Sequence, residues 1–514
     1  MGQKQPNILF LLSDEHNAKC LGHTSDGKVK TPHLDRLAAE GVRCANAVPQ
    51  SPICTPSRVS FASGQYPHNH GYYGLAGRCD DGPDRMADLP HLFGHCQANG
   101  YRVGAVGKTH LPPDWIDASC DTYVEDKDPD RGYPAFLERE GIDLRRSASL
   151  DWGRRCKEAD PPLFGHDGGP DELGYEHSVE HWEAEEAKAF LDQHRDEPFF
   201  LQVGFWRPHT PCTPSPEFWD LYPDPEALEP PNADSEFVRD VAPLREKREE
   251  LEAIAPERFA FEPRDYVSMR RRYLRGYYGC VSQTDRAVGE ILDHLDHLGL
   301  ADNTIVVYSS DHGDFAVEHG LTEKAPGIWS DAVTRIPFIW RFPGQLPTGV
   351  TRDALIESVD LAPTVCRLAG LPPMATTDGL DIADCLASGA PTERRVAVTE
   401  NPWSRAVFDG RYRLVHAVPE LREAGVLTDV QADPWEMTNH FDDPEWREIR
   451  ERLRRELLDW QIARTRVTTV HPSLARGGTV YGKDPGGRGH PVDADGKRGH
   501  DYIKEVRERN DRYL

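Results

Sequence analysis

The sequence lacks three features that would each point to a specific class of protein. It contains no CxxC pair, so a metal site built from paired thiols is not expected. It has no apolar run long enough to cross a membrane, and the first one, residues 7–12, is too short for a secretory signal. It also lacks an excess of positive charge, because the formal net charge is −26. Nucleic acid and membranes are therefore not expected as partners.

The cysteine content and the length set further limits. An odd number of cysteines, 11, without a recognisable signal segment favours reduced thiols and a cytoplasmic location. A chain of 514 residues with 38% hydrophobic content can form one large and one smaller domain. We expect a large domain over 1–390 with insertions near 112–170 and 222–265, a small C-terminal domain over 391–464 and an extension over 465–514. The extension lacks apolar periodicity, so it is expected to be an arm over a neighbouring subunit, a substrate lid or a disordered terminus.

Four continuous apolar runs predict strands that are buried on both faces, as in a mostly parallel sheet. The runs cover 8–12, 101–106, 198–205 and 304–309, with helices expected over 31–41, 179–194 and 275–298. Each run leads directly into a polar stretch, and these stretches contain Asp14-Glu15-His16, Lys108-Thr109-His110, Arg207-Pro208-His209 and Asp311-His312. Because the carboxyl ends of parallel strands meet at one edge of a sheet, these polar groups are expected to converge there.

The most specific local pattern is Cys54-Thr55-Pro56-Ser57-Arg58, followed by small residues up to Gly64. Thr55 suits an N-cap, Pro56 the first helical position and Gly64 the position after the end, which predicts a short helix with Cys54 just before it. The unpaired N–H groups at that end favour negative charge. We therefore expect a lowered pKa for the Cys54 thiol, or an anionic ligand held beside it. Taken alone, the residue could equally be an ordinary buried thiol.

Two strand ends supply candidate metal ligands. Asp14 with Glu15, and Asp311 with His312, would crowd carboxylates into a buried cleft, where a divalent cation is their natural partner. Oxygen ligands suit Ca²⁺ or Mg²⁺, whereas His312 favours Mn²⁺ or Zn²⁺. Side chains that could stabilise a tetrahedral anion at the same point are Arg58, Lys108, His110, His209 and Lys324.

With these motifs, residues 6–439 resemble the sulfatase family of the alkaline phosphatase superfamily. The resemblance is carried by Cys54-x-Pro56-x-Arg58, Gly107-Lys108-Thr109-His110, Arg207-Pro208-His209 and Ser310-Asp311-His312-Gly313 through Lys324, with 360–364 and 433–439 in support. It implies an α/β fold: a large α/β/α sandwich with a mostly parallel mixed sheet, and a small C-terminal α+β domain with an antiparallel sheet. A hairpin around residues 408–411 and a helix over about 444–463 fit that small domain.

The resemblance also implies an activity, the hydrolysis of sulfate esters to sulfate and an alcohol or phenol. A maturation enzyme would convert Cys54 to formylglycine, whose hydrate is the nucleophile. One divalent metal, with Ca²⁺ expected and Mn²⁺ or Zn²⁺ as alternatives, would be held by Asp14, Glu15, Cys54, Asp311 and His312. The roles implied for the other residues are hydrate binding by Arg58, neutralisation of the sulfate oxygens by Lys108 and Lys324, leaving-group protonation by His209 and proton removal by His110.

Two positions depart from the family pattern. The usual Asp-Asp and Asp-Asn pairs are here Asp14-Glu15 and Asp311-His312. Because His312 resembles the phosphonate monoester hydrolase and promiscuous arylsulfatase branch, a phosphonate monoester or phosphodiester is the alternative substrate. Outside enzymes, the alternative is a protein that binds a sulfated ligand without turnover. Phosphomutase-like relatives would use Ser or Thr as the nucleophile and are not expected. The leaving group stays open, and so does a homo-oligomeric state.

Overall fold

The computed structural model of the chain describes residues 5–74, 89–151, 168–254, 265–325, 327–417 and 425–466. The chain forms two compact units, Met1–Asp459 and Trp460–Leu514. Within the second unit, residues 460–466 are described; they end helix α16 (Arg447–Arg464), and the Gln461 amide donates a hydrogen bond to the Thr465 hydroxyl (2.8 Å). Most of the predicted extension, 467–514, and parts of both predicted insertions, 152–167 and 255–264, lie outside the described residues.

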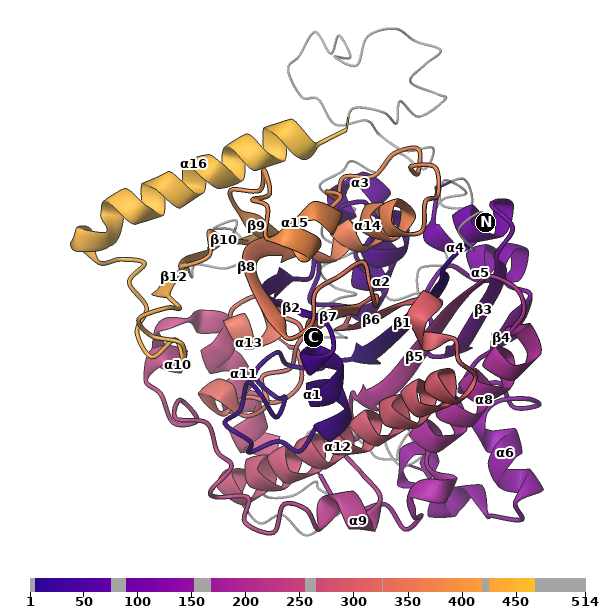
Figure 1. The fold of residues 1–514 in the computed structure, drawn as a ribbon. Helices are drawn as coiled ribbons and strands as arrows, with labels where there is room; N and C mark the ends of the chain where they lie inside the picture. Colours follow the sequence, from indigo (N-terminus) through magenta and orange to yellow (C-terminus); the bar gives the residue numbers. More distant parts are fainter. Residues whose placement is uncertain are drawn as a thin grey trace, which may run out of the picture. The chain divides into compact units, whose positions relative to one another are not determined.

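The first unit is built on an eight-stranded sheet with the order β4-β3-β5-β1-β6-β7-β2-β8 (Figure 1). Neighbouring strands run parallel except at β7, which is antiparallel to both β6 and β2. This is the mostly parallel mixed sheet that was predicted. The strands are β1 (Asn7–Asp14), β2 (Val42–Val48), β3 (Arg102–Gly107), β4 (Thr122–Val124), β5 (Phe199–Pro208), β6 (Thr304–Ser310), β7 (Phe338–Arg341) and β8 (Val350–Glu357).

The four predicted apolar runs form β1, β3, β5 and β6, which are adjacent in the sheet. All eight residues of β1 are buried. Its alternate side chains serve two separate cores, with Ile8, Phe10 and Leu12 in one and Leu9 and Leu11 in the other. A central strand covered on both faces needs an apolar side chain at every position, which explains why these runs are continuous rather than alternating.

Helices cover both faces of the sheet (Figure 1). One core contains side chains of α2 (Cys54–Ser63), α4 (Leu92–Ala98), α5 (Pro113–Ser119), α14 (Leu361–Leu368) and α15 (Ala383–Ser388). The other core contains side chains of α1 (Pro32–Ala39), α8 (Val179–His194) and α12 (Tyr266–His297). Helix α8 has the predicted bounds. Helix α12 begins earlier than predicted because Asp265 caps it, accepting a hydrogen bond from the Ser268 amide (2.8 Å).

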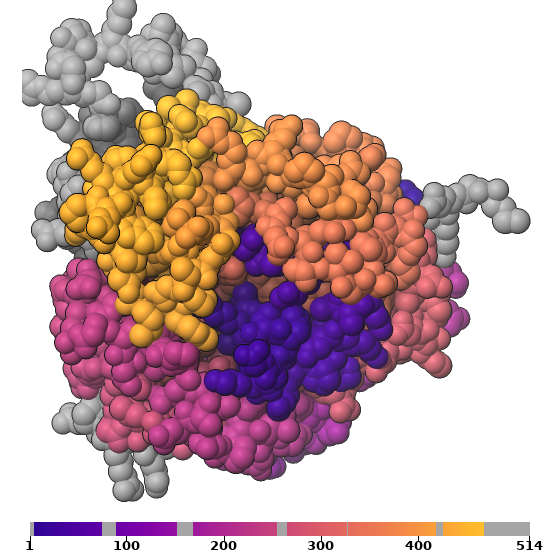
Figure 2. Space-filling view, turned by 60° about the vertical axis from the view of Figure 1, so that its left-hand side comes forward, coloured from indigo at the N-terminus to yellow at the C-terminus, as the bar shows by residue number. Residues whose placement is uncertain are grey.

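The two predicted insertions contribute structure to this unit. Strand β4, within 112–170, forms an edge of the main sheet and is followed by α6 (Tyr133–Arg139). The stretch 222–265 contains α10 (Phe237–Asp240) and α11 (Ala242–Ile254), whose apolar side chains are buried in a third core. On the face in Figure 2, indigo residues near the N-terminus lie between orange and magenta segments that follow much later in the chain.

A second sheet has the antiparallel order β12-β11-β10-β9, as predicted for the C-terminal part. Its strands are β9 (Ala397–Asn401), β10 (Ser404–Phe408), β11 (Tyr412–Ala417) and β12 (Val426–Asp429). The predicted hairpin joins β10 to β11. Its turn is closed by Asp409, whose side chain accepts hydrogen bonds from the amides of Arg411 (2.9 Å) and Tyr412 (2.7 Å). Among the described residues, no helix combines the length and apolar character that a membrane span requires.

Candidate active site

Four strand ends bring the predicted polar residues together. Strands β3, β5, β1 and β6 lie side by side, so the residues that follow them meet at one edge of the sheet. The ends of β3 and β5 approach closely, with the Lys108 amide donating to the Gly204 carbonyl (2.7 Å). A Cβ atom at Gly204 would lie 2.0 Å from the Lys108 carbonyl oxygen, so only glycine permits this approach.

Helix α2 delivers Cys54 to this edge. The helix begins at Cys54 with Ile53 as N-cap, two residues earlier than the predicted Thr55 cap, and ends at Gly64 in the left-handed conformation (φ 66°) as predicted. All ten residues of α2 are buried. The Cys54 Sγ atom lies 3.3 Å from His312 Nε2 and 3.6 Å from Asp14 Oδ1.

The expected lowering of the Cys54 pKa is wrong. Burial raises the pKa of the thiol to about 12, with a further increase from the Asp14 carboxylate that Lys108 and Lys324 oppose. Loss of solvation and a facing negative charge therefore outweigh the helix N-terminus. An unmodified Cys54 stays protonated at neutral pH and is a poor nucleophile.

Arg58, one helical turn after Cys54, ties two strand ends together. Its guanidinium donates to Asp311 Oδ2 from Nε (2.7 Å), to Asp14 Oδ2 from Nη2 (2.8 Å) and to the Lys108 carbonyl from Nη1 (2.6 Å). Only 1% of Arg58 is exposed. A fully paired, planar guanidinium in a buried position fixes the two carboxylates relative to Cys54.

Asp14, Cys54, Asp311 and His312 form a group of four buried residues that fits a divalent metal. Their ligand atoms all lie within 4.8 Å of one another. His312 donates from Nδ1 to the Gly313 carbonyl (2.9 Å), which leaves the Nε2 lone pair directed toward Cys54 and, at 3.7 Å, Asp311 Oδ1. Two carboxylates, an imidazole with its other nitrogen fixed and a side chain at Cys54 are a competent set of ligands.

Lys108 adds positive charge beside this group. Its Nζ atom lies 2.7 Å from Asp14 Oδ2, and the side chain is almost fully buried. Burial alone would raise the pKa of Asp14, but Lys108, His209 and Arg58 together hold it well below its usual value. Asp14 is therefore ionised at neutral pH, as a metal ligand must be.

Glu15 faces a different set of partners from Asp14. Its backbone has a left-handed φ of 67°, and its amide donates to Asp311 Oδ1 (3.2 Å). The carboxylate lies with Lys324, at 2.5 Å from Oε1 to Nζ, while Oε2 has no hydrogen-bond partner among the residues that the structure describes. Burial raises the pKa of Glu15 to about 8, although Lys324 partly offsets the effect. The structure thus groups the Glu15 side chain with Asp14 and His209 and leaves it out of the four-residue group.

His209 and His110 are both held in the neutral form. Burial, followed by the charges of Lys108 and Lys324, lowers the pKa of His209 well below its usual value. His209 donates from Nδ1 to the Thr210 carbonyl (2.8 Å), so its Nε2 accepts a hydrogen bond from Lys324 Nζ (3.2 Å). Burial, Lys108 and Arg58 lower the pKa of His110 to about 2, and its buried Nδ1 atom has no partner among the described residues.

Sequence reasoning missed the residues that support this site. The Ser57 hydroxyl donates to the Asp311 carbonyl (2.5 Å), the His16 amide donates to the Ser310 hydroxyl (2.8 Å), and Tyr277 donates to the Glu15 carbonyl (2.6 Å). Ser57 lies within the Cys54 motif, and this position is the one signal in the sequence that could have identified it. Tyr277 comes from α12, 262 positions away, and no local pattern indicates its role.

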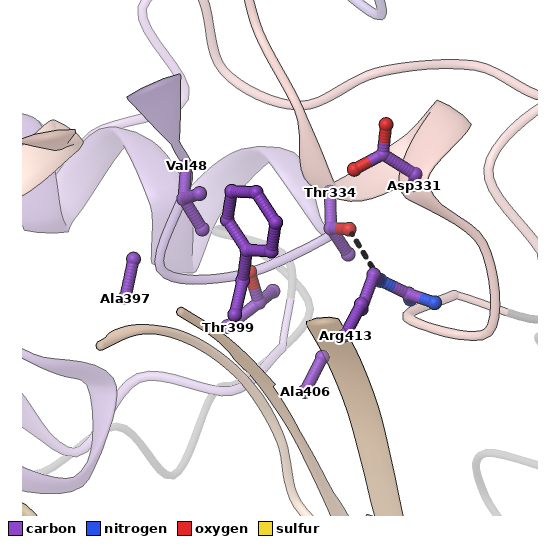
Figure 3. Close-up of a pocket in the computed structure, with 8 residues that line it drawn as sticks. Val48, Asp331, Thr334, Ala397, Thr399, Ala406 and Arg413 are labelled. Carbon is purple, nitrogen blue, oxygen red and sulfur yellow. Dashed lines mark hydrogen bonds between the residues drawn. The ribbon is translucent and has the colours of Figure 1, made fainter. Parts of the chain in front are cut away.

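A small cavity in the structure shares no lining residue with the candidate site. It lies between the end of β2, helix α13 (Asp331–Thr334) and the second sheet (Figure 3). Arg413 crosses it and donates from Nε to the Thr334 hydroxyl (3.2 Å). The cavity is lined by Val48, Asp331, Thr334, Ala397, Thr399, Ala406, Phe408 and Arg413. We interpret it as a packing gap behind the second sheet.

Comparison with known proteins identifies the family of the chain. The family model "Sulfatase" matches residues 6–371, and the model "N-sulphoglucosamine sulphohydrolase, C-terminal" matches residues 317–463. An ulvan-active sulfatase of Formosa agariphila is 27% identical over 87% of this chain and 80% of that protein. An arylsulfatase of Clostridium perfringens is 25% identical over 88% and 94%, respectively. The solved structure of a phosphonate monoester hydrolase from Silicibacter pomeroyi shares the fold, with a TM-score of 0.73 at 22% identity over 90% of this chain and 96% of that one.

Proposed function

The chain belongs to the sulfatase family of sulfuric ester hydrolases, and on this premise we propose that it hydrolyses small sulfate esters with a nucleophile made from Cys54. The observation that carries the proposal is the position of Cys54 Sγ, buried within one ligand group with Asp14, Asp311 and His312. A thiol with a pKa of about 12 is a poor nucleophile. Conversion of Cys54 to formylglycine would place a competent nucleophile at the same position.

A divalent metal held by Asp14, Asp311, His312 and modified Cys54 would supply positive charge that lowers the pKa of the attacking hydroxyl of formylglycine. Arg58 forms an ion pair with each of the two carboxylates and holds both in place. Lys108 brings a further buried cation to the same point, where it can bind a sulfate oxygen.

Lys324 and His209 serve the leaving group in this proposal. The neutral His209 accepts a hydrogen bond from Lys324, so Lys324 carries the proton of the pair. When the leaving oxygen gains negative charge, the Lys324 ammonium can give up one proton to His209 Nε2, which passes it to that oxygen and leaves Lys324 as a neutral amine. Glu15 orients Lys324 through its carboxylate. His110, neutral and with a free Nδ1, is the candidate acceptor for the proton removed when sulfate leaves.

The test combines peptide mass analysis at Cys54 with kinetics on an aryl sulfate. We expect formylglycine at Cys54 in active preparations and loss of turnover by at least about a thousandfold in Cys54→Ala. Cys120→Ala, at a half-buried thiol elsewhere, is the matched control and should keep wild-type kcat/KM. An unmodified Cys54 in a fully active preparation, or an active Cys54→Ala variant, would contradict the proposal.

One observation favours a second candidate, a phosphonate monoester or phosphodiester hydrolase. His312 places an imidazole in the ligand group, where the usual family residue is Asn. The variant His312→Asn restores that residue. If His312 supports phosphonate turnover, the variant should lose at least about tenfold in kcat/KM for an aryl phosphonate monoester relative to the matching aryl sulfate. An unchanged ratio would remove the reason for this candidate.

A further inference from the structure

Helices α8 and α12 carry a second group of metal-ligating side chains, distinct from the Cys54 site. His181 and Glu185 stand four positions apart on α8 and so share a face of that helix, and Glu290 projects from α12, which packs against it. The His181 Nδ1 atom, a Glu185 carboxylate oxygen and a Glu290 carboxylate oxygen all lie within 4.8 Å of one another.

The central atoms of this group are buried and only loosely paired. His181 Nδ1 and Glu290 Oε2 face each other at 3.5 Å as an ion pair, and neither atom has a closer hydrogen-bond partner in the described part of the chain. Tyr175, 5% exposed, stacks edge-on against the His181 ring at 5.3 Å between ring centroids. Burial and the Glu290 carboxylate, to which its hydroxyl is hydrogen-bonded, raise the pKa of Tyr175, so this hydroxyl lies beside the same carboxylate. Buried polar atoms in folded proteins are usually more closely paired than His181 Nδ1 and Glu290 Oε2 are here.

A nearby histidine–carboxylate pair on the same two helices, partly exposed to solvent, gives a comparison. His294 of α12 and Asp192 of α8 approach to 2.9 Å between Nε2 and Oδ1, which is a normal hydrogen bond. The separation of 3.5 Å between His181 and Glu290 is longer. It matches the spacing of about 3.4 Å between two ligand atoms that each lie about 2.0–2.1 Å from a tetrahedral Zn²⁺ ion.

We propose that His181, Glu185 and Glu290 form a Zn²⁺ site that ties α8 to α12. One imidazole and two carboxylates suit Zn²⁺ better than Ca²⁺ or Mg²⁺, which prefer oxygen ligands alone. Arg286 bonds Glu290 through Oε1 (2.9 Å), which leaves Oε2 for the metal. Lys188 pairs with Glu185 and would have to release that carboxylate. The proposal does not rest on the proposed function, because none of these residues belongs to the Cys54 site.

The proposed Zn²⁺ site would also stabilise the candidate active site, through helix α8. Two further side chains of α8 hold the end of β5. Glu180 pairs with Arg207 (2.9 Å), and Glu183 accepts a hydrogen bond from the Trp206 amide (3.2 Å). Fixing α8 against α12 therefore steadies the strand end that carries His209, and we expect the metal to act on stability.

The experiment is equilibrium dialysis of the full chain against Zn²⁺, comparing wild type with His181→Ala, Glu290→Gln and the exposed-residue variant Glu185→Gln. Wild type should bind one more equivalent, with a micromolar Kd, than His181→Ala or Glu290→Gln, and Glu185→Gln should bind that equivalent about tenfold more weakly. Zn²⁺ should also raise the wild-type Tm by a few degrees and leave the Tm of His181→Ala unchanged.

The matched control is His294→Ala, which removes the neighbouring histidine between the same helices and should keep the extra equivalent. Glu185→Gln changes an exposed carboxylate and should fold normally, so the test does not depend on buried substitutions alone. Equal Zn²⁺ stoichiometry in wild type, His181→Ala and Glu290→Gln would overturn the proposal. A Kd in the millimolar range, which would mean an adventitious ion only, would overturn it as well.

Discussion

Two buried glutamates, Glu15 and Glu436, show how differently the same side chain is used in two regions of this molecule. Both are 0% exposed, and both have left-handed backbones, with φ of 67° and 48°. Glu436 accepts hydrogen bonds from Ser330 Oγ (2.8 Å), the Asp331 amide (2.7 Å), Thr428 Oγ1 (2.9 Å) and Arg413 Nη1 (3.0 Å). Glu15 has one partner for Oε1, Lys324, and none for Oε2.

The pKa values follow from these contacts. Burial acts to raise both, but Arg413 and the surrounding donors lower the pKa of Glu436 to about 2. At Glu15 burial prevails, and the pKa rises to about 8. A carboxylate with every lone pair satisfied holds the second sheet against the loop around Ser330. A half-satisfied carboxyl group beside Lys324 and His209 titrates close to neutral pH and can therefore exchange a proton where the proposed chemistry takes place.

The largest expected effect, on the free energy of unfolding, comes from removing Glu436, the glutamate whose hydrogen bonds are all made. Glu436→Ala leaves the Arg413 guanidinium buried without its counter-charge, so the free energy of unfolding should fall by about 3–5 kcal/mol. Measured on folded protein well below the Tm, kcat/KM for an aryl sulfate should stay within about threefold of wild type. Chemical denaturation monitored by circular dichroism gives the first quantity. The exposed Glu448→Ala is the control and should change stability by less than about 0.5 kcal/mol. A stable Glu436→Ala protein would show that this network is not structural.

The opposite pattern is expected at Glu15. Glu15→Gln removes a carboxyl group whose ionisation burial opposes, so stability should be unchanged or higher, while Lys324 loses the ionisable partner that orients it. We expect kcat/KM to fall about tenfold, or about 1.4 kcal/mol. Glu318→Gln is the matched control, because the Glu318 carboxylate is fully partnered by Lys19, Asn17 and Asn232. It should lose stability and keep its kinetics. If Glu15→Gln lost stability and kept its kinetics, Glu15 would have a structural role, and the proposed contrast with Glu436 would be wrong.

A smaller effect, on the pH dependence of stability, is expected at His70. Unlike Glu436, this buried side chain stays neutral. His70, beside α2, accepts a hydrogen bond from the Tyr72 amide at Nδ1 (3.1 Å) and so donates from Nε2 to Ser60 Oγ (3.0 Å). Burial lowers the pKa of His70 to about 3. Between pH 6.5 and 3 the unfolded chain therefore takes up a proton that the folded chain refuses, and stability falls as the pH falls, by at most about 1.4 kcal/mol per unit.

The variant His70→Gln should remove that contribution. Its free energy of unfolding should decline less steeply than that of wild type between pH 6.5 and 4.5, measured by denaturant titration at each pH. His297→Gln, at an exposed histidine of α12, is the control and should change the slope less than His70→Gln does. Identical slopes for wild type and His70→Gln would mean that His70 does not titrate as its burial implies.

The strand ends could be predicted because their physical signal is local. Central parallel strands need continuous apolar runs, and the polar residues directly after β1, β3, β5 and β6 had to meet at one edge. Strands β2, β4, β7 and β8 were not predicted. β4 and β7 have only three and four residues, and β2 and the first half of β8 are partly exposed, so none of them has such a run.

Other features depend on contacts that no local pattern encodes. Glu15 follows Asp14 directly, yet a left-handed backbone and Lys324, 309 positions away, decide which group its side chain joins. The pKa of Cys54 was predicted in the wrong direction, because the helix N-terminus is visible in the sequence and the facing Asp14 is not. Glu436 stood inside a recognised stretch, but its partner Ser330 lies 106 positions earlier.

The central claim is that sulfate esters are hydrolysed at Cys54. The most direct test is the ratio of kcat/KM for an aryl sulfate to kcat/KM for the aryl phosphonate monoester with the same leaving group, on one preparation whose peptide mass shows formylglycine at Cys54. The account predicts a ratio well above one. A ratio below one would contradict it and assign the site to phosphonate hydrolysis.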